Sequence, residues 1–149
     1  MASLVYTSYP ADVWNGNCNT THSYKAILTT SAHTIDRLHT KRSQITNELP
    51  TANGYTQGGA AIAVSVSTST TTHKMLLTIG QVSWPSSSLT ARQLHVFRSR
   101  GGASSADELV CVVENTVGGA STDLVSSNST MSWNTPNGTT WEIPLPAPV

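Results

Sequence analysis

Short segments with the period of a β-strand recur along most of the chain. Tyr24, Ala26 and Leu28 lie at alternate positions after Ser23, which predicts one strand there. Further strand-like segments, separated by Gly- and Asn-containing turns, span residues 60–67, 74–79, 89–99, 108–115, 130–135 and 139–143. Several short strands at such spacing are typical of an all-β fold. We therefore expect an antiparallel sandwich or a jelly-roll-like barrel.

One segment departs from the β pattern. Between residues 32 and 49, apolar residues fall at helix-like spacings, namely Ile35, Leu38, Ile45 and Leu49. The many Ser and Thr residues in this stretch are mediocre helix formers. The sequence therefore predicts one short helix from about Ile35 to Arg42, followed by an irregular remainder that ends at Pro50.

Residues 1–21 follow neither period. Tyr6, Tyr9 and Trp14 lie there among Pro, Asn and Gly residues, so we expect an extended N-terminal arm. Exposed rings of this size are costly in water, which indicates that they pack on this chain's core or on a neighbour. Residues 22–149 then form a single β domain whose end, from Pro144 to Pro148, reads as a proline-rich extended tail.

The chain carries few charges, and they balance. Eight Lys and Arg face eight Asp and Glu, charged residues make up 11% of the 149 residues, and Ser and Thr about 28%. Binding to nucleic acid or to an anionic membrane relies on a basic surplus, so we expect neither partner. The start of the chain does not support a secretory signal, and no apolar run exceeds five residues. Low charge weakens repulsion between molecules, which favours a protein that works inside an assembly.

No residue pattern indicates catalysis, a cofactor or a metal. His33, Asp36 and His39 are close in sequence, but their spacing of three does not place both imidazoles on one helix face. The chain has neither a nucleophile elbow nor a phosphate-binding loop. We interpret Asp107 and Glu108 as a solvated lead into a strand. We therefore expect no enzymatic activity and no cofactor.

The two cysteines are far apart. Cys18 and Cys111 permit one disulfide, but Cys111 lies inside an apolar run. That position favours a buried free thiol that packs as a small hydrophobic residue.

Aromatic and basic residues supply the candidate contacts with other proteins. The arm contributes aromatic rings, and the end of the predicted strand 89–99 contributes guanidinium groups that either stay solvated or meet an acidic partner surface. These candidates are Tyr6, Tyr9, Trp14, Arg98 and Arg100. A second group of rings either fills the core, which we favour because the chain has a single Phe, or stacks on sugars. This group is Trp84, Trp133 and Trp141.

Three blocks of sequence motifs follow one another along the chain. The first joins residues 27–32 and 47–49 to the segment 54–60, which reads Gly-Tyr-Thr-Gln-Gly-Gly-Ala. The second joins residues 82–84, which end in Trp84, to 88–97, which contain Thr-Ala-Arg. The third joins residues 109–114 to 131–134, ahead of Gly138. Together these blocks, across residues 25–143, resemble a family of small bacteriophage virion proteins.

The resemblance implies a non-enzymatic structural protein located in the virion and assembled in the host cytoplasm. Its expected role is a head decoration or cement protein that binds the major capsid protein or other virion proteins. The alternative is a tail, fibre or baseplate component, or a carbohydrate-binding module that recognises a host surface. The resemblance also implies a homo-oligomer, with a trimer at local three-fold sites as one form.

Overall fold

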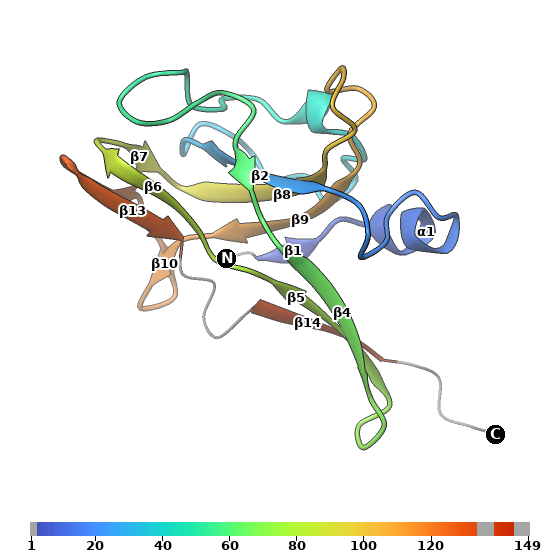
Figure 1. Cartoon of the computed structure of the whole chain (residues 1–149). Coiled ribbons are helices and arrows are strands. Elements are labelled where there is room, and N and C mark those ends of the chain that lie inside the picture. The colour runs from blue at the N-terminus through green and yellow to red at the C-terminus, as the bar shows by residue number, and fades with distance from the viewer. Residues whose placement is uncertain (1–2, 134–138, 145–149) are drawn as a thin grey trace.

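The computed structural model describes residues 3–133 and 139–144, and it is an all-β fold of antiparallel sheets with one short α-helix. The largest sheet has five strands in the order β1-β9-β8-β2-β3 (Figure 1). These strands are β1 (Leu4–Val5), β9 (Leu109–Glu114), β8 (Gln93–Arg98), β2 (Tyr24–Thr29) and β3 (Ala60–Ala61). The two outer strands have only two residues each, so the long strands lie in the centre.

The three central strands are buried on both faces. In β2, Ile27 and Thr29 are as buried as Ala26 and Leu28, because the sheet packs against apolar side chains on each side. One face joins the main core, to which Leu28, Leu94 and Cys111 contribute. The other face carries a smaller cluster, which consists of Tyr6, Ile27, Phe97, Leu109 and Val112 and is covered in part by Leu4, Ile35 and Ile45.

Smaller sheets surround the large one. They pair β6 with β13, β7 with β12, and β10 with β11, and they join β14, β5 and β4 in that order. The strands are β4 (Val64–Ser69), β5 (Lys74–Ile79), β6 (Val82–Ser87), β7 (Thr90–Ala91), β10 (Thr116–Val117), β11 (Ala120–Ser121), β12 (Leu124–Val125), β13 (Ser129–Trp133) and β14 (Thr139–Pro144). Apolar side chains from several of these strands, including Leu77, Trp84 and Trp133, complete the main core. The β4–β5 hairpin extends away from the large sheet (Figure 1).

The prediction of a helix from Ile35 to Arg42 is wrong, and the α-helix of this chain lies nearer its N-terminus. From Ile35 to Thr40 the chain is irregular apart from a turn at Arg37 and Leu38, and the 3₁₀ turn η1 (Arg42–Gln44) follows. Ile35 and Ile45 instead lie against the smaller apolar cluster, so their spacing reflects contact with the sheet and not a helix face.

The α-helix, α1 (Tyr9–Trp14), lies within the segment that we expected to be an extended arm. Pro10 stands in its first turn, where a missing N–H removes no helical hydrogen bond. Before it, Leu4 and Val5 pair with Val112 and Cys111 of β9. The N-terminal segment is therefore a packed part of the β domain and not an extended arm. The proline-rich tail lies outside the described residues beyond Pro144, which ends β14.

Candidate functional site

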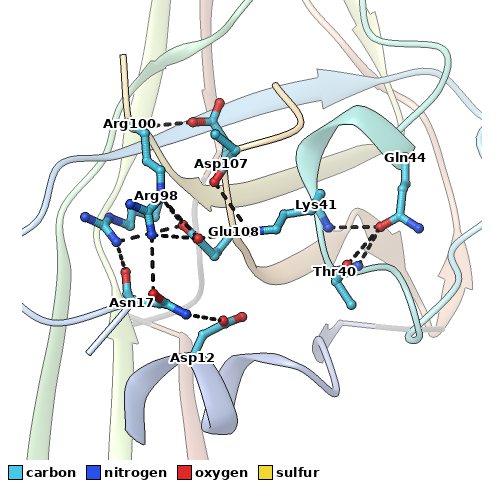
Figure 2. A network of polar contacts seen from close by, with 10 residues as sticks. Asp12, Asn17, Thr40, Lys41, Gln44, Arg98, Arg100, Asp107 and Glu108 are labelled. Atoms are coloured by element: carbon cyan, nitrogen blue, oxygen red, sulfur yellow. Dashed lines mark hydrogen bonds and ion pairs between the residues drawn. The ribbon is translucent and has the colours of Figure 1, made fainter. Parts of the chain in front are cut away.

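Asp107 and Glu108 form a buried pair of acidic residues at the start of β9. They are only 1% and 2% exposed, so the expectation of a solvated lead into the strand is wrong. The Lys41 ammonium donates to Glu108 Oε1 at 2.9 Å, and Arg42 Nη1 donates to Asp107 Oδ2 at 3.1 Å. Both cations come from the segment around η1, and Figure 2 shows Lys41 pointing from this segment toward Glu108.

Arg100 supplies the closest contacts to the same carboxylates. Its guanidinium donates to Glu108 through Nη2 at 2.8 Å and through Nε at 3.0 Å, and its backbone N–H donates to Asp107 Oδ1 at 2.8 Å. Burial alone would raise the pKa of Glu108, but the hydrogen bonds from Arg100 and Lys41 outweigh it and lower this pKa to about 2. Glu108 is therefore a carboxylate at neutral pH, held by cations on several sides.

The network continues from β8 to the loop after α1. Arg98 Nη1 donates to the carbonyl oxygen of Asn17, and Arg100 Nη2 lies 3.4 Å from Asn17 Oδ1. The Asn17 amide in turn donates to Asp12 Oδ1 at 3.1 Å, within the helix (Figure 2). A chain of polar contacts thus ties the buried acidic pair to α1 and fixes the helix on the sheet.

Trp14 is the last residue of this anchored helix, and its side chain points into solvent. It is 91% exposed, while Tyr9 at the other end of the helix is 1% exposed and Val13 packs against the core. An indole ring offers a large apolar surface with a polar N–H, which suits a contact with another protein. Figure 1 shows α1 at the edge of the domain. The anchored helix therefore carries an exposed aromatic side chain that this chain's own core does not cover.

The five candidate contact residues differ in how far this chain buries or binds their side chains. Tyr6 and Tyr9 are buried in this chain's own core, at 0% and 1% exposure. Arg98 and Arg100 bind Asn17 and Glu108 within the chain, and their side chains are 15% and 35% exposed. Trp14 alone of the five is left largely free for a partner.

Sequence reasoning missed the acidic pair and its cations. A signal was present, because the predicted strands 89–99 and 108–115 follow each other and pair as a hairpin. In that hairpin the Arg98 N–H donates to the Glu108 carbonyl oxygen at 2.8 Å, so basic and acidic side chains meet at the hairpin end. Lys41, Arg42 and Asn17 carried no comparable signal, because irregular segments bring them there.

A second polar cluster surrounds His95 in the middle of β8. The imidazole is fully buried, its Nδ1 lies 2.7 Å from the Tyr6 hydroxyl, and its ring meets that of His33 edge-on at 4.8 Å. Burial, and secondarily the neighbouring His33 and His39, hold the pKa of His95 well below its usual value. Within the described residues, His, Cys, Asp and Glu form no group of three or more placed to bind a metal ion.

The remaining sequence predictions concern thiols and tryptophans. Cys111 is a buried free thiol, as predicted, and Cys18 is a second one. Trp84 and Trp133 are 5% and 3% exposed within the main core, which confirms the core-packing interpretation for both. The Trp141 side chain lies outside the described residues.

No helix in the described part of the chain is long and apolar enough to span a membrane. Comparisons with models of known protein families, with characterised proteins and with solved structures find no match for this chain.

Proposed function

We propose that this chain is a non-enzymatic structural protein of a bacteriophage particle, a decoration protein that binds the major capsid protein on the assembled head. The observation that carries the proposal is the 91% exposed Trp14 on a helix that buried charges hold in place. The virion role itself rests on the sequence resemblance over residues 25–143, and Trp14 supplies the contact that such a role requires. We also propose that the large sheet and the smaller antiparallel sheets that share the main core with it form a sandwich.

The physical argument concerns the cost of binding. Interfaces draw most of their affinity from a few anchors, among which Trp is enriched, and loss of conformational freedom opposes association. Trp14 is an anchor on an element that is already ordered, because Asn17 links α1 to Arg98 and Arg100. A partner with an apolar pocket thus gains the burial of the ring without first ordering the helix that carries it.

Charge supports the same proposal. The chain has a net charge of zero, so its copies do not repel one another when they sit close together on a shell. The alternative role, sugar recognition on a tail or fibre, is less well supported. Among the described tryptophans Trp84 and Trp133 lie in the core, which leaves Trp14 as the exposed ring.

The proposal is tested on particles that lack the protein. Purified wild-type protein, Trp14→Ala and the control Leu38→Ala are added to such heads, and the bound amount is measured against concentration. Leu38 is a suitable control because it is apolar and 68% exposed but lies outside α1. Loss of a central anchor costs about 2 kcal/mol or more, so Trp14→Ala weakens binding about thirtyfold, while Leu38→Ala binds as wild type. Absence of wild-type binding to heads contradicts the proposal, and equal binding by Trp14→Ala removes Trp14 from it.

A further inference from the structure

Within the part of the chain that the structure describes, strand β4 is the open edge of the projecting three-stranded sheet. It pairs with β5 on one side, and no other strand of the described residues pairs with its second side. Natural proteins blunt such edges with Lys, Pro, bulges or very short strands. β4 has six residues, reads Val-Ser-Val-Ser-Thr-Ser, and keeps an unbroken register with β5 from Val64 to Ser69. None of the usual protective devices is present within it.

The backbone groups on the open side can be assigned from the ladder. The carbonyl oxygen of Ala63 accepts a hydrogen bond from the Gly80 N–H at 2.8 Å, which makes these two residues a hydrogen-bonded pair. Bonded and non-bonded pairs alternate in an antiparallel ladder. Ser65 and Ser67 therefore bond to β5, whereas Val64, Val66 and Thr68 direct their N–H and C=O groups to the open side.

We propose that β4 pairs with β4 of a second copy of this chain, antiparallel and around a two-fold axis at Val66. The outward groups at positions 64, 66 and 68 are symmetric about Val66, so the same edge supplies matching donors and acceptors to its copy. The result is a continuous six-stranded antiparallel sheet in the order β14-β5-β4-β4-β5-β14. This inference does not depend on the virion role.

Strand direction and side chains favour a second copy in this arrangement. β14 and β4 both run antiparallel to β5, so a ring closed head-to-tail through β4 and β14 would need a parallel junction, which is slightly less stable. The two-fold arrangement keeps every junction antiparallel. Val64 and Val66 are half-buried and pack against the core, so the partner's identical side chains extend an existing apolar face. β4 carries no charge to oppose the approach of its copy.

The decisive variant is Thr68→Pro, with Thr68→Ala as its matched control. The Thr68 N–H faces the open side, so proline removes a donor to the second copy and leaves the β4–β5 bonds intact. Both variants remove the threonine side chain, but only proline blocks the edge. Circular dichroism and thermal unfolding first establish that each variant folds.

Sedimentation equilibrium then gives the mass over concentrations from about 1 to 500 µM, because dimer formation depends on protomer concentration. We expect the wild type and Thr68→Ala to dimerise, and Thr68→Pro to dissociate at least tenfold more readily. A wild-type monomer throughout this range, a wild-type trimer, or a folded Thr68→Pro that dimerises as well as wild type overturns the proposal.

Cross-linking tests the register independently of any folding defect. In the proposed register the two Val66 residues form a hydrogen-bonded pair, whose Cα atoms lie about 5.5 Å apart and within disulfide range. Val66→Cys should therefore give a covalent dimer under mild oxidation. Wild type should not, because Cys18 and Cys111 are buried. Failure of Val66→Cys to cross-link, or faster cross-linking of Ser69→Cys, contradicts pairing centred on Val66. Because these tests use the isolated protein, they succeed or fail separately from the head-binding test.

Discussion

The Tyr6 hydroxyl and His95 Nδ1 lie 2.7 Å apart in the core, although 89 positions separate the two residues in the chain. The other imidazole nitrogen lies 3.2 Å from Thr29 Oγ1, which donates to Gln93 Oε1 at 2.9 Å. The Gln93 amide donates in turn to the His33 carbonyl oxygen. One tautomer satisfies this series, with the proton of His95 on Nε2 and the Tyr6 hydroxyl as donor to Nδ1. The N-terminal segment is thus held to β8 by a directional set of hydrogen bonds.

Tyr6→Phe should destabilise the fold by about 1–3 kcal/mol, because it leaves a buried imidazole acceptor without a donor. The ring and its packing with the apolar cluster are retained, so the loss reports the hydrogen bond. Urea denaturation of wild type and variant measures the change. A variant as stable as wild type would show that the Tyr6–His95 bond contributes nothing net to folding.

The strands that sequence reasoning found best are those whose pattern is local. Lys74–Ile79 has its predicted bounds. Leu109–Glu114 lies within the predicted segment, because its continuous apolar run marks a strand buried on both faces. Val82–Ser87 is not among the predicted strands. Pro85 weakens the strand pattern there, but β6 accommodates this proline in a two-stranded sheet with β13. The helix Tyr9–Trp14 is too short to show a period.

The candidate site was harder to predict because it depends on contacts between distant segments. Trp14 was identified by its type alone, and its exposure follows from which face of α1 the rest of the fold covers. The burial of Glu108 depends on Lys41, 67 positions away, and on Arg100 across the hairpin. A sequence shows that such charges exist, but the register and the loops decide whether they meet in the core or stay in water.

Protein stability should fall as the pH falls below about 6.5, the usual histidine pKa. The folded chain keeps His95 neutral because burial, with His33 and His39 nearby, lowers its pKa, and burial also lowers the pKa of His33. Below about pH 6.5 the unfolded chain binds protons at these histidines and the folded chain does not. Each such histidine therefore lowers the free energy of unfolding by up to about 1.4 kcal/mol for each pH unit below 6.5. Urea denaturation between about pH 7 and pH 5 measures how the free energy of unfolding changes with pH. Glu108 in the folded chain has its pKa far below this pH interval. A stability that is constant over this range contradicts the neutral buried cluster.

Gly59→Ala should be much more destabilising than Gly58→Ala. Both glycines have positive φ, +76° and +95°, so alanine pays a backbone cost of about 1–2 kcal/mol at each. A Cβ at Gly59 would lie 2.0 Å from the Ala26 carbonyl oxygen in β2, whereas a Cβ at Gly58 meets nothing within 4 Å. The difference in unfolding free energy between the two variants therefore isolates the steric contact. Equal destabilisation would mean that the segment after Gly58 does not lie against β2.

Glu108→Gln should lower the free energy of unfolding clearly more than a surface substitution does, because it leaves Lys41 and Arg100 without their common carboxylate, a side chain that is only 3% exposed. Asp123→Asn is the matched control. Asp123 contacts Arg92 at 2.7 Å, but the two side chains are 35% and 25% exposed, so water screens the pair and its loss should change stability less than the loss of the Glu108 carboxylate. Denaturation of both variants at low and high salt separates the cases, since added salt should reduce the Asp123 effect and leave most of the Glu108 effect. Glu108→Gln should also free Arg100 from its place beside Asn17, so hydrogen exchange should increase in α1 first. Equal costs for the two variants would show that the charge network behind Trp14 behaves as an ordinary surface cluster and does not hold the helix.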